Sequence, residues 1–191
     1  MRANQVITRI SVLILALWVS TLSAAELHAR SAKWAQPIKT DQLQNFYKLD
    51  DKVYRSEQPD RKGFDYLRSF GIRNVLNLRD YHKDDSKAKG TGLTLYRVEM
   101  SAGKITVDEV VAALRIIRQS DGPIVIHCWH GSDRTGTVSA LYRIVFQNWS
   151  KEEAIDELMK GGYGYHAMYK NIPAFIRSAD IDDIKRRVFA P

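Results

Sequence analysis

The sequence contains a single cysteine, Cys128, so no disulfide can form within the chain. A lone cysteine is most often a buried, inert side chain. His127 and His130 flank it closely enough to suggest a metal site. However, adjacent residues on a strand point in opposite directions, and the sequence has no second cluster of ligands. We therefore expect no metal, and the neighbours of Cys128 must decide whether its thiol is reactive.

The chain also lacks long runs of one charge. It has 29 Lys and Arg residues against 22 Asp and Glu, a net charge of +7, and only residues 185–187 form a basic run. Such a run is typical of the solvated face of a terminal helix, so we expect no nucleic-acid partner. With 45% apolar residues, a chain of 191 residues can bury the core of one ordinary domain. We expect a monomer.

Long apolar runs are absent except near the N-terminus. Residues 10–22 are apolar, follow Arg2 and Arg9, and are followed by three small residues that end at Ala25. This run is short for a membrane span, and the pattern is typical of a secretory signal. We predict that residues 1–25 are a signal peptide, cleaved near Ala25, and that the mature protein is exported. An uncleaved anchor is the alternative, and it would be the protein's contact with a membrane.

Strand and helix patterns alternate along the rest of the chain. Residues 26–44 are polar and irregular, which indicates a lead-in segment before a single domain at 45–191. The patterns predict a hairpin at 45–56, strands at 72–79, 93–100 and 123–128, and helices at 60–71, 106–119, 135–149 and from 150 onward. This alternation indicates an α/β fold with a mainly parallel central sheet flanked by helices. Ligands of such folds bind at the carboxyl ends of the strands.

The loop from Cys128 to Thr135 lies at such an end and has the chemistry of a phosphate site. Its backbone N–H groups can turn inward at a helix N-terminus and form an anion nest, and Gly131 permits the dihedral angles this needs. The helix dipole and the Arg134 guanidinium favour the Cys128 thiolate. The planar fork of Arg134 can also bind two phosphoryl oxygens. We therefore predict covalent catalysis through a phosphocysteine.

The remaining residues of this loop have supporting roles in the prediction. The Thr135 hydroxyl can donate to the sulfur and help it leave, and His127 orients the loop rather than acting as a base. The side chains of Trp129 and His130 point away from the nest and shape its entrance. The residues expected to bind the substrate are Trp129, His130, Gly131, Ser132, Asp133 and Arg134.

The run HCWHGSDRTG resembles the active-site signature of the protein tyrosine phosphatase superfamily, Cys-(x)5-Arg followed by Ser or Thr. The segments YRSEQP, VLNLR and GGYGYH are similar to the small dual-specificity group of bacteria, fungi and plants. The lead-in RSAKWAQ and the export signal resemble periplasmic tyrosine phosphatases of Gram-negative bacteria. The resemblance covers residues 45–187. It implies a periplasmic phosphatase that needs no metal or cofactor and acts on phosphotyrosine in a protein, with phosphoserine and phosphothreonine left open.

The general acid is where the sequence departs from this family. Many members carry an aspartate in the loop before the third helix, but here that loop reads EMSAGKIT. Glu99 more naturally ends the strand, and Asp108 is an ordinary charge at a helix N-terminus. Related bacterial phosphatases have an Asp directly before the loop arginine, so we predict Asp133 as the acid. Asp133 as a structural partner of Arg134 is the alternative, and Asp80 remains a further candidate.

A weakly placed acid predicts a preference for phosphotyrosine, because a phenol is a far better leaving group than an aliphatic alcohol. Other functions remain open. An inositol phosphate or phosphoinositide phosphatase is one, although the loop has none of the lysines typical of lipid-directed members. A phosphate-binding module without catalysis is another. A sulfurtransferase fits poorly with Arg134 and Thr135.

Several residues outside the loop are predicted to be structural. Arg79 and Asp80 end the strand expected beside the Cys128 strand, where they could rim the pocket, but we predict that they form a salt-bridged structural pair. Arg55, in YRSEQP, either faces the substrate or anchors the sheet edge. Tyr163 and His166 are assigned to a structural turn.

Overall fold

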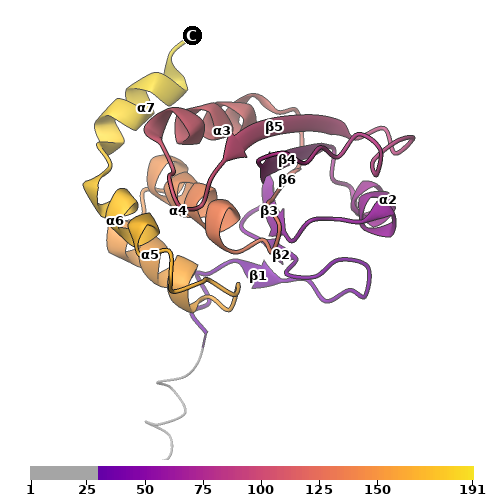
Figure 1. Cartoon of the computed structure of the whole chain (residues 1–191), viewed down its shortest axis with the longest axis horizontal. Coiled ribbons are helices and arrows are strands. Elements are labelled where there is room, and N and C mark those ends of the chain that lie inside the picture. The colour runs from indigo at the N-terminus through magenta and orange to yellow at the C-terminus, as the bar shows by residue number, and fades with distance from the viewer. Residues whose placement is uncertain (1–29) are drawn as a thin grey trace, which may run out of the picture. The chain divides into compact units, whose positions relative to one another are not determined.

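A six-stranded sheet runs through the protein in the strand order β1-β2-β3-β6-β4-β5 (Figure 1). The computed structural model describes residues 30–191, so the predicted signal peptide lies outside the described residues. The strands are β1 (Gln36–Pro37), β2 (Tyr47–Lys48), β3 (Val53–Ser56), β4 (Asn74–Arg79), β5 (Thr94–Met100) and β6 (Ile124–His127). The helices are α2 (Arg61–Phe70), α3 (Val107–Gln119), α4 (Asp133–Gln147), α5 (Lys151–Lys160), α6 (Asn171–Ser178) and α7 (Ile181–Phe189).

The sheet is mainly parallel, which confirms the predicted fold class. β3, β6, β4 and β5 run parallel, while β1 and β2 are antiparallel additions at one edge. β2 and β3 form the hairpin predicted at 45–56. The expected irregular lead-in at 26–44 differs in detail, because Gln36 and Pro37 form β1 and pair with β2. Ala35 and Leu43 in the same segment are buried, so this part of the chain joins the sheet and the core.

Helices cover both faces of the sheet (Figure 1). Alternate residues of the central strand β6 point to opposite faces. Ile124 and Ile126 belong to the larger core, together with residues of α3 to α7. Val125 packs into a smaller core with Phe64 and Leu67 of α2. A strand that is apolar on both faces is typical of the middle of a parallel sheet, and here it brings Cys128 to the centre of the fold.

The helix ends follow local capping signals. Capping boxes at Thr106 and Ser150 begin α3 and α5, which agrees with the predicted helix starts at 106 and 150. Gly71, the last residue of the helix predicted at 60–71, ends α2 in the left-handed conformation. α4 begins at Asp133 and ends at Gln147, two residues before the predicted 135–149 at each end. Its early start places Arg134 within the first turn of the helix.

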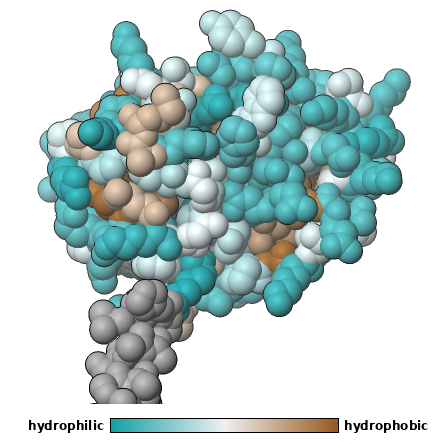
Figure 2. All heavy atoms as spheres, turned by 60° about the horizontal axis from the view of Figure 1, so that its bottom comes forward, coloured by the Kyte–Doolittle hydropathy of each residue, from teal (hydrophilic) through white to brown (hydrophobic). Residues whose placement is uncertain are grey.

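The surface in Figure 2 is mostly hydrophilic, with separate small apolar areas. None of the helices between residues 30 and 191 combines the length and the apolar character needed to cross a bilayer. The large apolar side chains that are exposed come from different elements, and among them Trp129 belongs to the predicted site loop. This exposed tryptophan is therefore of interest for the site rather than for packing.

Candidate active site

Cys128 directly follows β6, at the carboxyl end of a strand held between β3 and β4. Cys128 is only 2% exposed to solvent. In register, His127 faces Ser56 on one side and Asn77 on the other. The loop that follows is therefore surrounded by the ends of three parallel strands, the position at which α/β folds bind ligands.

The loop after Cys128 is shaped by close backbone packing at Gly131. This residue has φ 71°, and a Cβ atom there would lie 2.4 Å from the carbonyl oxygen of Ser56. Only glycine avoids both the strain and the overlap. On the other side of the loop, the Ser132 hydroxyl donates to the carbonyl of Tyr163 at 2.6 Å. The conformation predicted for an anion nest thus depends on contacts to β3 and to the turn after α5.

Arg55, on β3, holds this loop in place through a contact with Gly131. Arg55 is only 1% exposed to solvent. Its Nη2 donates to the Gly131 carbonyl at 2.6 Å, and its guanidinium lies 3.6 Å from the centre of the Tyr163 ring. Burial lowers the pKa of Arg55, and the nearby Glu157 carboxylate opposes that shift. Of the two predicted roles, the structure supports the anchor and not contact with substrate. Tyr163, assigned to a structural turn, belongs to the same support.

Arg134 points toward the ends of β4 and β5. Its Nη1 donates to Asp80 Oδ1 at 2.9 Å and to the Met100 carbonyl at 3.2 Å. The side chain of Arg134 is 15% exposed and that of Asp80 is 41% exposed. The guanidinium is therefore held at the mouth of the loop, beside a carboxylate that solvent reaches. Asp80 is bound to Arg134, so the salt bridge predicted between Asp80 and Arg79 is wrong.

Asp133 has a different partner from the one the sequence suggested. Its Oδ1 accepts from the His166 backbone N–H at 3.0 Å, and its Oδ2 lies 2.8 Å from His166 Nδ1. The side chain of Asp133 is only 10% exposed. The carboxylate thus ties the start of α4 to the turn after α5, and its hydrogen bonds are with His166 rather than Arg134. The turn role predicted for His166 is consistent with this pair.

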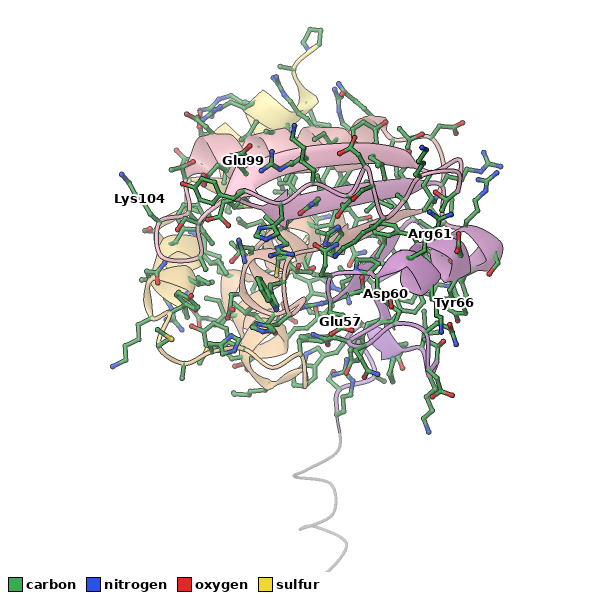
Figure 3. All side chains as sticks on the ribbon, turned by 45° about the vertical axis from the view of Figure 1, so that its right-hand side comes forward. Glu57, Asp60, Arg61, Tyr66, Glu99 and Lys104 are labelled. Carbon is green, nitrogen blue, oxygen red and sulfur yellow. The ribbon has the colours of Figure 1, made fainter. Side chains whose placement is uncertain are left out.

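Asp108, the other carboxylate that the sequence left open, lies at the start of α3 and forms an ion pair with Arg187 of α7. Its side chain is 84% exposed. Glu99, on β5, pairs with Arg97 at 2.6 Å. Lys104, in the loop that follows β5, extends into solvent (Figure 3). These contacts agree with the structural readings of Asp108 and Glu99.

His127 lies behind the loop and has no exposure to solvent. Its Nε2 lies 2.9 Å from Asp84 Oδ2, and its Nδ1 lies 3.1 Å from the Cys128 carbonyl. Burial alone would raise the pKa of Asp84, but the hydrogen bond and charge of His127 hold that pKa below its ordinary value. The position is the one predicted for an orienting residue. The sequence did not reveal Asp84, because nothing local marks one acid in a charged loop as buried.

Arg79 continues this buried network. Its Nη1 donates to Gln58 Oε1 at 3.0 Å, and Gln58 Nε2 donates to Asp84 Oδ1 at 2.9 Å. The Arg79 guanidinium also lies 4.3 Å from the centre of the Trp129 ring. Trp129 itself is 54% exposed, and His130 is exposed beside it. Arg79 therefore rims the loop, as the sequence allowed, but with Gln58 and Trp129 as its partners.

Thr135 is fully buried at the start of α4. Its hydroxyl has no hydrogen-bond partner within residues 30–191, and Cys128 Sγ is therefore not in bonding position in this state of the loop. Within the same residues, no three His, Cys, Asp or Glu side chains are grouped to hold a metal ion.

Comparisons with known proteins identify the family. Residues 42–186 match the tyrosine phosphatase family. The dual specificity protein phosphatase TpbA of Pseudomonas aeruginosa (strain UCBPP-PA14) is 32% identical over 169 residues, which cover 86% of this chain and 75% of TpbA. The inositol diphosphatase SIW14 of Saccharomyces cerevisiae is 31% identical over 153 residues, which cover 75% of this chain and 53% of SIW14.

Solved structures lead to the same family. A crystal structure of P. aeruginosa TpbA superposes with a TM-score of 0.76 at 28% identity, covering 85% of this chain and 100% of that one. A cysteine-to-serine variant of TpbA in complex with pTyr gives 0.76 at 27% identity with the same coverage. The catalytic core of SIW14 from S. cerevisiae in complex with citrate gives 0.67 at 30% identity, covering 78% of this chain and 93% of that one.

The chain therefore belongs to the tyrosine phosphatase family. It has the mixed α/β fold of these neighbours. It is an enzyme, a cysteine-dependent phosphatase of the protein tyrosine phosphatase type.

Proposed function

We propose that the enzyme hydrolyses phosphotyrosine in proteins through a phosphocysteine on Cys128. The observation that carries the proposal is the position of Cys128, buried at the end of β6 and followed by a glycine-shaped loop that leads into Arg134. The complex of the related TpbA variant with pTyr supports the choice of substrate.

The chemistry follows from these positions. The Cys128 thiolate attacks phosphorus while the bond to the tyrosyl oxygen breaks, and the leaving oxygen takes a proton from a carboxylic acid. Loop N–H groups and the fork of Arg134 stabilise the charge on the equatorial oxygens. A water molecule then attacks the phosphocysteine, gives its proton to the same carboxylate, and releases phosphate and the thiolate. Thr135 is proposed to donate to the departing sulfur after its side chain rotates about the Cα–Cβ bond and brings Oγ1 to the sulfur.

A second substrate class has support of its own. Besides SIW14, an inositol diphosphatase from Arabidopsis thaliana is 30% identical over 125 residues, covering 61% of each chain. Inositol phosphates are therefore the alternative substrates. Against them stands the composition of the loop, where Trp129, His130 and Ser132 supply no lysine.

The test uses the full chain with EDTA present, on a phosphotyrosine peptide, the matching phosphoserine peptide and inositol phosphates, beside Cys128→Ser. We expect phosphotyrosine to be hydrolysed fastest and Cys128→Ser to be inactive while still binding the phosphopeptide. Activity that survives in Cys128→Ser would overturn the mechanism. Faster turnover of inositol phosphates would overturn the substrate choice, and binding without turnover by the wild type would indicate a phosphate-binding module.

The proton donor can be chosen between two carboxylates. Asp133, the residue predicted from the sequence, is little exposed and has both oxygens engaged by His166. Asp80 is more exposed and touches the arginine that would hold the phosphoryl group. Because a general acid must reach the leaving oxygen from the open side of the site, these contacts favour Asp80. We therefore propose Asp80 as the general acid, and the sequence-based prediction of Asp133 is the alternative.

Leaving groups of different basicity distinguish the two. Asp80→Asn should lose at least about a hundredfold in kcat on phosphotyrosine and much less on p-nitrophenyl phosphate, whose leaving group needs little protonation. Asp133→Asn should reduce both rates by a similar factor, through loss of the His166 contact. If the dependence on the leaving group appeared in Asp133→Asn instead, Asp133 would be the acid.

Export to the periplasm and a monomeric state are further proposals. Export is supported by the apolar run at residues 10–22, with its basic flank and small residues up to Ala25. Sequencing the N-terminus of the protein recovered from a Gram-negative host tests the predicted cleavage. Gel filtration with light scattering measures the oligomeric state. A mature chain beginning at Met1 would overturn the cleavage.

A further inference from the structure

A cavity of about 390 Å³ lies beside the catalytic loop. We will call it the Arg79 cavity, and its lining includes Gln58, Arg79, His82, Lys87, Trp129 and His130. We propose that the Arg79 cavity binds an acidic side chain, Glu or Asp, that lies close to the phosphotyrosine in the substrate protein. This inference rests on the proposed function and adds a feature of the substrate sequence to it.

Arg79 is a buried cation in the lining of the cavity. The residue is 5% exposed, and its partners are the neutral side chains of Gln58 and Trp129. No carboxylate within residues 30–191 forms an ion pair with its guanidinium. Burial lowers the pKa of Arg79 and the positive charge of Arg134 lowers it further, while the charges of Asp84 and Asp80 only partly offset these two effects. A buried cation in this situation is stabilised by an anion that enters the cavity, so the site favours a negatively charged ligand.

The cavity lining carries both positive and negative side chains. Among the side chains that keep their charge at neutral pH, Arg79 and Lys87 are positive and Glu57, which also lines the cavity, is negative. Glu57 lies in the loop between β3 and α2 (Figure 3), and its Oε1 accepts from the backbone of Gln44 at 3.2 Å. One net positive charge matches a singly charged carboxylate better than a phosphoryl dianion. The charge balance therefore selects an acidic side chain over a second phosphate.

The Arg79 cavity adjoins the catalytic loop. Trp129 and His130 line the cavity and are also the two residues directly after Cys128. The Gln58 backbone N–H donates to the Trp129 carbonyl at 2.9 Å, which fixes the cavity wall to the catalytic loop. A peptide whose phosphate is bound by this loop must pass close to the cavity on its way out. A residue near the phosphotyrosine can thus reach the cavity without a change in the fold.

Lys87 offers the cleanest variant, because it is exposed and lies in the cavity lining. Arg79 is less suitable, since its substitution would also disturb Gln58 and Asp84 behind the loop. The experiment measures kcat/KM of the full chain on phosphotyrosine peptides that carry Glu or the isosteric Gln within two residues of the phosphotyrosine, on either side. The ratio of the two values on one enzyme preparation reports recognition of the acid separately from catalysis. In at least one peptide position, the wild type should prefer Glu by about threefold to tenfold.

Lys87→Glu should abolish this preference, and a peptide with Lys at the same position should then become the better substrate. Lys89→Glu is the matched control, because it changes the same charge in the same loop but lies outside the cavity lining. It should keep the wild-type ratio.

An enzyme that hydrolyses no phosphotyrosine peptide would refute the proposed function. An active enzyme without the preference would overturn only the cavity proposal, as would an equal loss in both variants. A loss by Lys87→Glu confined to inositol phosphates would also overturn it.

Discussion

At the scale of single residues, Gly131 shows how one backbone contact sets the catalytic loop. The residue combines a positive φ with an approach of its absent Cβ to the backbone of Ser56. A side-chain contact could relax, but a contact with a strand backbone cannot. The shape of the phosphate loop is therefore fixed by β3 as much as by its own sequence.

Replacing Gly131 with alanine tests this. We expect kcat/KM to fall by about a hundredfold, because the loop must move away from Ser56 and the groups that hold the phosphate are displaced. Gly92→Ala is the control, since Gly92 has φ 70° but nothing within 4 Å of an added Cβ. That variant should lose about 1 kcal/mol of unfolding free energy and keep its activity. Steady-state kinetics and denaturant unfolding measure the two effects, and equal activity losses would refute the role of the Ser56 contact.

Single residues also show where sequence reasoning reaches its limit. Cys128 and Arg134 could be assigned because their spacing in a strand-loop-helix unit dictates where they lie. The partners of Asp133 and Asp80 could not, because His166 and Arg134 are distant in the chain and only the fold brings them close. A carboxylate next to an arginine in sequence need not contact it, since neighbours on a helix point in different directions.

At the scale of elements, α4 and α5 are joined by one buried ion pair. The Glu157 carboxylate accepts from Arg143 Nε at 2.9 Å and Nη2 at 3.0 Å, and both side chains are about 4–5% exposed. Its Oε1 also accepts from the backbone of Ala35 at 2.6 Å and from the Tyr163 hydroxyl at 2.9 Å. A single acid on α5 thus positions α4, the segment before β1, and the turn that supports the catalytic loop.

Glu157→Gln should therefore lower the free energy of unfolding by about 3–5 kcal/mol, because it leaves the buried Arg143 charge without its counter-ion. Glu152→Gln is the control on the same helix. Glu152 receives the same two types of hydrogen bond from Arg177, at 2.8 and 2.9 Å, but its side chain is 65% exposed. It should change stability little, since water screens the pair. Urea unfolding compares the two variants, and similar losses would contradict the importance of burial.

The elements themselves were largely predictable because their signals are local. The two capping boxes, the stop at Gly71 and the apolar run of β6 all act within a few residues. β1 could not be found in this way. Its two residues, Gln36 and Pro37, are exposed and carry no strand pattern, and they form a strand only because β2 is available to pair with them.

At the scale of the whole molecule, a buried polar network lies behind Cys128, at the carboxyl ends of the interior strands β4 and β6. It runs from Arg79 through Gln58 and Asp84 to His127, and so connects β4, the loop before α2, the loop after β4, and β6. Asp84 is the acid at its centre and is 4% exposed. Because every partner comes from a different segment, the network reports on the integrity of the fold around the active site.

The pH dependence of stability should follow from Asp84. Its pKa in the folded protein lies below the ordinary value, where hydrogen bonds and charge from His127 outweigh the opposing effect of burial. The ionised carboxylate therefore stabilises the fold above the unfolded pKa of about 4, and this contribution is lost as the pH falls through the lower, folded pKa. Asp84→Asn should remove about 1–3 kcal/mol of unfolding free energy at neutral pH. It should also flatten the decline in stability below about pH 4.

Asp51→Asn provides the comparison in the same acid range. The pKa of Asp51 is also lowered, through its hydrogen bond from Lys48, but its side chain is 99% exposed. Salt should therefore screen the contribution of Asp51 and leave that of the buried Asp84 in place. Urea unfolding measured across the acid range in high salt separates the two: the slope with pH should flatten in Asp84→Asn and match the wild type in Asp51→Asn. An unchanged slope in Asp84→Asn would show that the network behind Cys128 does not depend on the ionised acid.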